Sequence, residues 1–367
     1  MGMTPHSRRF VAAFTAVLAA ALLLLVPGSP AAAATADRFG FALVDNPAVP
    51  TWTVLPVPYQ FGSWASPAVA TGGKVATGRF LVRFPGIGAG ARGNVHVTAA
   101  ARDGRFCETV RWYSSGLDEI VDVQCFKAGG SPADTPFTVL WTVSSGVLPT
   151  GTGAYASLQV TGNTLTQAYN STGSPVSVTP VAVGVYAVKL AGVGLASGVQ
   201  AGNVQVTAVQ PNAQPRRCKI LKWGAAGVDV VGYVACHDPV TGAPMNSDFT
   251  ASYHRERSVY ASFGPPKYFG YLATPYGGPT NFSYPLGVGA NGWGPLGTGT
   301  YTVKFPVLHE KATTAHLTAI GDGPGYCTLL DKWVLAGAAD AVVPVACFDN
   351  AGNPDKSEFS VAFSSSV

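Results

Sequence analysis

Six cysteines carry the most regular chemical signal in the chain, because they occur as three evenly placed pairs. The two members of a pair are 18, 18 and 20 residues apart, and successive pairs begin 111 and 109 residues apart. Thiols can form disulfides, bind a metal or undergo redox chemistry, but no pair has Cys-x-x-Cys spacing, and one pair cannot enclose a metal ion by itself. The repeat therefore predicts one structural bridge per pair: Cys107–Cys125, Cys218–Cys236 and Cys327–Cys347.

The histidines are the next candidates for chemistry. His96 and His316 occupy equivalent places in the repeat, and Gln205 stands there in the second copy. Because a shared catalytic base would not be replaced by glutamine, we expect these three to be strand residues that face solvent. His237 and Asp238 directly follow a cysteine, so an acid–base role stays open there, although the sequence identifies no nucleophile.

Enzyme motifs are absent from the sequence. It contains no GxSxG, no HExxH, no P-loop and no GxGxxG that follows a strand, so we assign no catalytic residue, no metal ligand and no cofactor. The net charge of +4 is too small to indicate nucleic-acid binding or attachment to an acidic membrane. With 47% hydrophobic and only 11% charged residues, the composition excludes a charged disordered chain.

Aromatic residues that do not recur between the copies are the candidates for ligand binding. Core positions should persist between copies, as Phe61, Tyr169 and Phe282 do, whereas surface loops are free to differ. Flat, rigid rings on loops suit stacking against sugars or anchoring a protein partner, and the alternative is that they fill the ends of each unit or pack between units. The candidates are Trp52, Tyr59, Trp64, Tyr268, Tyr271, Tyr276, Tyr284 and Trp293.

One outward-facing strand position carries a cation in every copy: Arg83, Lys189 and Lys304. This position could present a ligand-binding cation three times. The interpretation that we favour is a charged side chain that prevents the edge of a hydrophobic strand from pairing with another chain.

These residues must be positioned by a repeated β-rich unit. Val95, Val97 and Ala99 alternate with polar residues, which is the period-two pattern of a strand. Gly, Pro and Ser clusters interrupt the chain at short intervals, and no long helical periodicity occurs beyond the N-terminal segment. We therefore expect an all-β chain of three tandem immunoglobulin-like β-sandwich domains, each with one internal disulfide between strands close in sequence.

The N-terminal segment predicts export. Arg8 and Arg9 precede an apolar run over residues 10–26, and small residues then lead to a cleavage site after Ala34 or Ala36. We expect residues 1–36 to be a cleaved signal peptide, with no membrane span after cleavage. The three sandwich domains would then cover residues 37–148, 149–256 and 257–367.

The repeated unit resembles a β-sandwich module of uncharacterised secreted actinobacterial proteins. The likeness is carried by the Asn-Val-x-Val-Thr-Ala strand at residues 94–99, by the set Cys107, Trp112 and Cys125, and by the Gly-x-Pro turn that ends at Pro132. It covers nearly all of residues 37–367. The resemblance implies a secreted β-sandwich array and transfers no catalytic residue.

These features favour a secreted, non-enzymatic extracellular binding or structural protein over an enzyme. We expect a monomer whose partner is an extracellular glycan or surface protein, bound through linked weak sites. Two alternatives stay open. One is a secreted hydrolase with an active site between domains, and the other is a secreted protease inhibitor that presents a loop.

Overall fold

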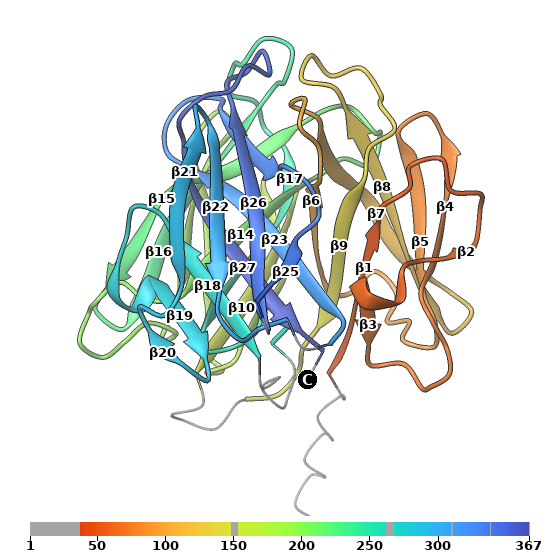
Figure 1. The fold of residues 1–367 in the computed structure, drawn as a ribbon. Coiled ribbons are helices and arrows are strands. Elements are labelled where there is room, and N and C mark those ends of the chain that lie inside the picture. The colour runs from red at the N-terminus through yellow and green to blue at the C-terminus, as the bar shows by residue number, and fades with distance from the viewer. Residues whose placement is uncertain (1–36, 148–152, 262–267, 310, 338, 367) are drawn as a thin grey trace, which may run out of the picture. The chain divides into compact units, whose positions relative to one another are not determined.

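The computed structural model describes residues 37–147, 153–261, 268–309, 311–337 and 339–366. The expected signal peptide and the junction at residues 148/149 lie outside the described residues. The all-β prediction is confirmed, since the described part of the chain contains strands, two short 3₁₀ turns (Val57–Tyr59 and Gly278–Thr280) and no α-helix (Figure 1).

The strands fall into three consecutive groups, called repeats 1, 2 and 3 below. Repeat 1 consists of β1 (Arg38–Val44), β2 (Thr53–Val54), β3 (Gln60–Gly62), β4 (Thr71–Ala76), β5 (Arg79–Phe84), β6 (Asn94–Ala99), β7 (Phe106–Ser115), β8 (Asp118–Phe126) and β9 (Phe137–Val143). Repeat 2 consists of β10 (Ala154–Thr161), β11 (Thr164–Asn170), β12 (Val176–Ala182), β13 (Val185–Leu190), β14 (Asn203–Val209), β15 (Arg217–Ala226), β16 (Asp229–His237) and β17 (Asp248–Arg255). Repeat 3 consists of β18 (Phe269–Ala273), β19 (Asn281–Tyr284), β20 (Gly287–Val288), β21 (Gly292–Gly297), β22 (Thr300–Phe305), β23 (Thr313–Ile320), β24 (Tyr326–Leu329), β25 (Val334–Ala336), β26 (Asp340–Phe348) and β27 (Glu358–Ser365).

Each repeat contributes two half-sheets, and neighbouring repeats share sheets. The half-sheet β11-β10-β17-β14 of repeat 2 continues into β7-β8-β5-β4-β2 of repeat 1. The half-sheet β12-β13-β16-β15 of repeat 2 likewise continues into β23-β27-β18-β19-β20 of repeat 3. The remaining sheets are β3-β1-β9-β6 in repeat 1 and β21-β22-β26-β24, with β25 also paired to β26, in repeat 3.

The shared sheets are joined by a short parallel contact that recurs three times in cyclic order. Val209 of repeat 2 pairs with Thr109 of repeat 1, and Ile320 of repeat 3 pairs with Ile220 of repeat 2. The equivalent bridge between Ala100 of repeat 1 and Leu329 of repeat 3 closes the cycle. Each contact is secured by a backbone hydrogen bond: Gln210 N–H to Thr109 O at 2.8 Å, Gly321 N–H to Ile220 O at 3.0 Å and Ala101 N–H to Leu329 O at 2.8 Å.

Three apolar cores follow the same cycle. Each core is built mainly from the two half-sheets of one repeat, and each also takes in a residue from the next repeat in the cycle. Val209 packs into the core of repeat 1, Ile320 into that of repeat 2 and Ala100 into that of repeat 3. The closing contacts are therefore apolar as well as hydrogen-bonded.

The disulfide prediction is confirmed for all three pairs. Each bridge links directly opposite residues of two antiparallel neighbours, namely β7 with β8, β15 with β16 and β24 with β26. The Cα atoms are 4.0, 4.1 and 4.0 Å apart, and the second cysteine of each pair is fully buried. The bridges clasp strands that are close in sequence, as expected.

The interpretation of the repeated cation as a guard of a strand edge is wrong. Strands β5, β13 and β22, which carry it, are each hydrogen-bonded to a neighbour on both sides and are not edges. Each cation instead pairs with an aspartate on the neighbouring strand of its own repeat. The pairs are Arg83–Asp118 at 3.7 Å, Lys189–Asp229 at 2.8 Å and Lys304–Asp340 at 2.7 Å.

Removal of one disulfide should lower the free energy of unfolding by a measurable amount. In the double variant Cys107→Ala/Cys125→Ala, the unfolded chain loses the constraint of an 18-residue loop, so the free energy of unfolding should fall by about 3 kcal/mol. Urea denaturation followed by tryptophan fluorescence measures this loss. If the variant unfolds at the same urea concentration as the wild type, the clasp does not contribute to stability.

Candidate functional site

The eight aromatic candidates divide into packed and exposed side chains. Tyr271 is fully buried, and Trp64 and Tyr268 pack against the cores of repeats 1 and 3. Tyr59 of repeat 1 contacts Trp333 of repeat 3 edge-on, with ring centroids 5.3 Å apart. Tyr276 of repeat 3 contacts Trp223 of repeat 2 in the same way at 6.4 Å. Tyr59 and Tyr276 therefore pack between repeats, which is the alternative to ligand binding stated above.

Three aromatic candidates are substantially exposed: Trp52 at 41%, Tyr284 at 42% and Trp293 at 44%. The guanidinium carbon of Arg83 lies over the ring of Trp52 at 5.4 Å, and Tyr284 stacks on Phe269 with centroids 6.0 Å apart. These contacts leave Trp293 as the exposed candidate that borders a groove.

The groove beside Trp293 has a volume of about 260 Å³. Trp293 lies on β21, which is an edge strand. Its ring contacts those of Tyr301, tilted at a centroid distance of 6.2 Å, and Phe359, edge-on at 6.4 Å. Polar side chains occur beside the indole ring, and burial raises the pKa of the Glu358 carboxyl. The residues that line the groove are Thr274, Pro275, Trp293, Tyr301, Lys356, Ser357 and Glu358.

The expectation that His96, Gln205 and His316 face solvent is wrong. All three are at least 99% buried. They do point away from the apolar core of their own repeat, but that face of β6, β14 and β23 is covered by the other repeats. Where the three strands meet, their polar side chains form a buried hydrogen-bonded layer.

Threonine hydroxyls hold this layer together in the same cyclic order as the sheets. In each repeat a threonine two positions after the His or Gln accepts a hydrogen bond from a backbone N–H of another repeat. The three bonds are Val97 N–H to Thr207 Oγ1 at 3.2 Å, Val206 N–H to Thr318 Oγ1 at 2.9 Å and Leu317 N–H to Thr98 Oγ1 at 3.1 Å.

The histidines of the layer are neutral members of this network. His96 Nε2 is hydrogen-bonded to the hydroxyl of Ser252 at 2.7 Å, and His316 Nε2 to that of Thr314 at 3.0 Å. Burial lowers the pKa of His96 to about 3, and burial also places the pKa of His316 well below 6.5. Their burial and hydrogen bonding favour a structural role over catalysis.

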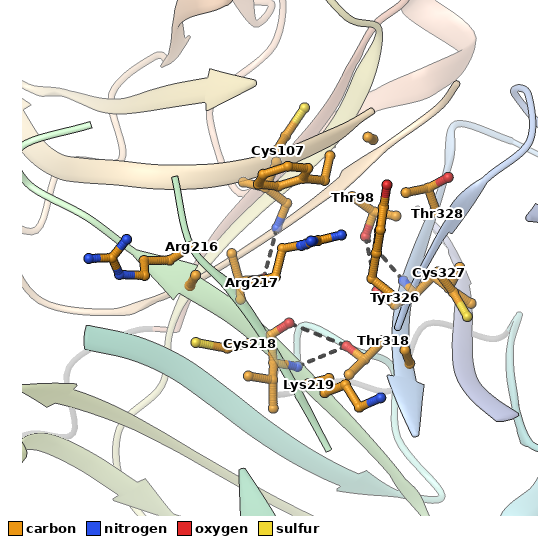
Figure 2. A pocket seen from close by; sticks show the side chains of 18 of the residues that line it. Thr98, Cys107, Arg216, Arg217, Cys218, Lys219, Thr318, Tyr326, Cys327 and Thr328 are labelled. Atoms are coloured by element: carbon orange, nitrogen blue, oxygen red, sulfur yellow. Dashed lines mark hydrogen bonds between the residues drawn. The ribbon is translucent and has the colours of Figure 1, made fainter. Parts of the chain in front are cut away.

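At the end of the buried layer a small pocket of about 60 Å³ opens between the three repeats (Figure 2). Thr98, Thr207 and Thr318 form part of its lining. The strand positions on either side of the first cysteine supply much of the rest. Before the cysteine these are Phe106, Arg217 and Tyr326, and after it they include Lys219 and Thr328.

The sequence reasoning missed this pocket, although a signal was present. In β7, β15 and β24 the cysteine recurs, whereas the residue before it is Phe, Arg or Tyr and the residue after it is Glu, Lys or Thr. Because side chains alternate along a strand, both flanking positions point away from the core that the cysteine faces. When equivalent positions that point away from the core differ so much in chemistry, the difference indicates a specialised site.

His237 also lines this pocket, but without a nucleophile. Its Nδ1 is hydrogen-bonded to Gly242 O at 3.2 Å, and its buried Nε2 has no hydrogen-bond partner among the described residues. Burial lowers its pKa. Asp238 accepts hydrogen bonds from the N–H groups of Val240 and Thr241 instead of contacting His237. The pair does not form a base-activated nucleophile.

The described residues offer neither a metal-ligand cluster nor a membrane-spanning helix. Within the described ranges no three His, Cys, Asp or Glu side chains are grouped so that they could hold a metal ion. None of the helices in the described part of the chain has the length and apolar character needed to cross a membrane.

The buried histidines should make the protein acid-labile in a specific way. The pKa of His96 is about 3 in the folded protein and about 6.5 when unfolded, so the unfolded chain takes up the proton first and stability falls as the pH drops below 6.5. In His96→Gln, which copies repeat 2, this contribution is absent. The difference in unfolding free energy between wild type and variant should change by about 1.4 kcal/mol per pH unit below pH 6.

Urea denaturation at pH 7.0, 5.5 and 4.5 measures that difference. His309→Gln is the control, because His309 is only partly buried and should give a weaker pH dependence. A difference between wild type and His96→Gln that is the same at all three pH values would show that folding does not lower the pKa of His96.

Comparison of the chain with protein-family models, with curated proteins and with solved structures finds no match.

Proposed function

We propose that this chain is a secreted, non-enzymatic extracellular binding protein of three β-sandwich repeats, and that it binds carbohydrate in the groove beside Trp293. The observation that carries the proposal is an exposed tryptophan, in contact with two buried aromatic rings, at the wall of an open groove that also contains charged and hydroxyl side chains.

The chemistry of the groove suits a sugar. The apolar C–H face of a sugar ring can stack on the indole, whose position is set by Tyr301 and Phe359. Sugar hydroxyls need donors and acceptors at the same time. Lys356 supplies donors and Glu358 supplies acceptors. Ser357 adds an acceptor, because its hydroxyl already donates to the carbonyl oxygen of Glu358 at 3.2 Å.

Export is supported by two features of the chain. The N-terminal residues have the composition of a signal peptide, and all six cysteines are paired in disulfides, which is typical of an oxidising compartment. Small, disulfide-clasped sandwiches with few charges suit a binding protein outside the cell.

A hydrolase with a site between the repeats is less well supported. Polar side chains do converge in the inter-repeat pocket, but no hydroxyl of a described residue is hydrogen-bonded to His237, so the described part of the pocket lacks an activated nucleophile. No observation favours a protease inhibitor.

The proposal predicts retention on insoluble glycans that depends on Trp293. Loss of the stacking surface in Trp293→Ala should release the protein from a cellulose, chitin or peptidoglycan column that retains the wild type. Tyr284→Ala is a matched control, because Tyr284 is similarly exposed but is not among the residues that line the groove.

A column experiment with all three proteins distinguishes the outcomes. Retention of wild type and Tyr284→Ala without retention of Trp293→Ala supports the proposal. Failure of the wild type to bind any glycan, or equal binding of all three, contradicts it. If the wild type binds only a deglycosylated surface protein, the ligand is a protein and the carbohydrate proposal is wrong.

A further inference from the structure

Arg217 in the inter-repeat pocket has hydrogen-bonding capacity that the protein does not use. Its side chain lies at the start of β15 and is only 6% exposed. Its Nε and Nη1 atoms are buried, and no acceptor among the described residues is hydrogen-bonded to either. Because buried donors in folded proteins almost always have partners, two unpartnered nitrogen atoms with three N–H groups on one guanidinium point to a group that is missing from the protein itself.

The protein holds this guanidinium in a fixed place. Its central carbon lies 4.0 Å from the ring centroid of Tyr326 and 5.1 Å from that of Phe106, so aromatic rings from repeats 3 and 1 contact it. Its Nη2 donates to the carbonyl oxygens of Pro239 and Asn350 at 3.3 Å, and to the side-chain oxygen of Asn350. Figure 2 shows Arg217 beside Tyr326 in the pocket, with Arg216 directed away from them.

Lys219 adds a second cation to the same pocket. Its side chain is 4% exposed, and Nζ donates to the carbonyl oxygens of Asp322 and Gly325, both at 3.1 Å. An ammonium group has three donors, so one N–H is left for a ligand. Burial lowers the pKa of Lys219 to about 8, which keeps most of its charge at pH 7.

The carboxylates nearest to these two cations lie outside the pocket lining. None of the residues that line the pocket is acidic, and no carboxylate among the described residues forms an ion pair with Arg217 or Lys219. Asp238 and Asp349 act on Arg217 from farther away, and Asp322 acts on Lys219, so that their charges oppose the lowering of these two pKa values by burial. The ion pair of Asp238 is with Arg216, at 3.8 Å. Glu108 accepts the N–H of Arg216 at 2.8 Å, and burial raises its pKa well above the usual value, so it supplies little negative charge.

Two buried cations that lack a directly paired carboxylate are costly unless an anion completes the site. We propose that the inter-repeat pocket binds a small oxyanion, such as a phosphate or carboxylate group, through Arg217 Nε and Nη1 and Lys219 Nζ. A pocket of about 60 Å³ admits several water-sized groups, which limits the ligand to a single anionic group.

The stoichiometry follows from the repeat. The three strand positions that precede the cysteines are equivalent, but they carry Phe106, Arg217 and Tyr326. Two copies therefore provide aromatic contacts and one provides the cation, so the three repeats together form one site. One anion should bind per chain.

Isothermal titration calorimetry tests the proposal with inorganic phosphate, sulfate and acetate, at constant ionic strength set with chloride. We expect saturable binding of one oxyanion per wild-type chain. Arg217→Gln and Lys219→Gln should each weaken binding by about tenfold or more, because each removes a charge-assisted hydrogen bond. Affinity should also fall as the pH rises through 8, where Lys219 loses its proton. Comparison of phosphate with acetate distinguishes a phosphate ligand from a carboxylate.

Two controls keep the outcome decisive. Arg102→Gln removes a guanidinium whose side chain is 71% exposed and should leave affinity unchanged, and Trp293→Ala should also leave it unchanged, which separates this site from the proposed glycan groove. If Arg217→Gln fails to fold, Lys219→Gln provides the same comparison. The absence of saturable binding for all three anions, or equal affinity in wild type and Lys219→Gln, would overturn the proposal.

Discussion

The structure depends on hydrogen bonds to polar side chains on a strand face that is buried between the repeats. In β6, β14 and β23 one side of the strand packs into an apolar core, and the other side carries Asn, His, Gln and Thr. Buried groups of this kind must be hydrogen-bonded, since each unmet donor or acceptor costs about 1–3 kcal/mol. No repeat satisfies this face alone. Thr98, Thr207 and Thr318 each accept a backbone hydrogen bond from another repeat. The described residues of the three repeats therefore form one compact unit rather than three independent domains.

Cyclic closure also explains how three similar repeats together form one asymmetric site. The backbones that surround the inter-repeat pocket are equivalent, but the side chains there differ: an arginine from repeat 2 lies against aromatic rings from repeats 1 and 3. The surface groove is different in kind, because Trp293 and its polar neighbours all come from repeat 3. Core and closure positions persist between the copies, while the pocket and the groove carry the differences.

Much of the architecture is predictable because it depends on patterns among residues that are close in sequence. Period-two alternation identified the strands, and the cysteine spacing identified the three bridges across adjacent strands. The same alternation showed that His96 lies opposite Val95 and Val97 but could not show what covers that face, because the covering residues, such as Ser252, are far away in the sequence. The closing bridge from Ala100 to Leu329 likewise has no local signature. Tyr59 was recognised as a non-repeating aromatic, but its partner Trp333 belongs to the other end of the chain. A role for Arg217 is not predictable from recurring positions, because the residue at this place differs in every copy.

Native-state hydrogen exchange tests the closed cycle most directly. The amides of Gln210, Gly321 and Ala101 donate the three equivalent hydrogen bonds between repeats, and only that of Ala101 joins the first repeat to the last. If the cycle is closed, all three amides exchange only through global unfolding, with the same free energy of opening. Exchange of the Ala101 amide at the rate of an unprotected peptide, with Gln210 and Gly321 still protected, would show an open row of three sandwiches and contradict the account.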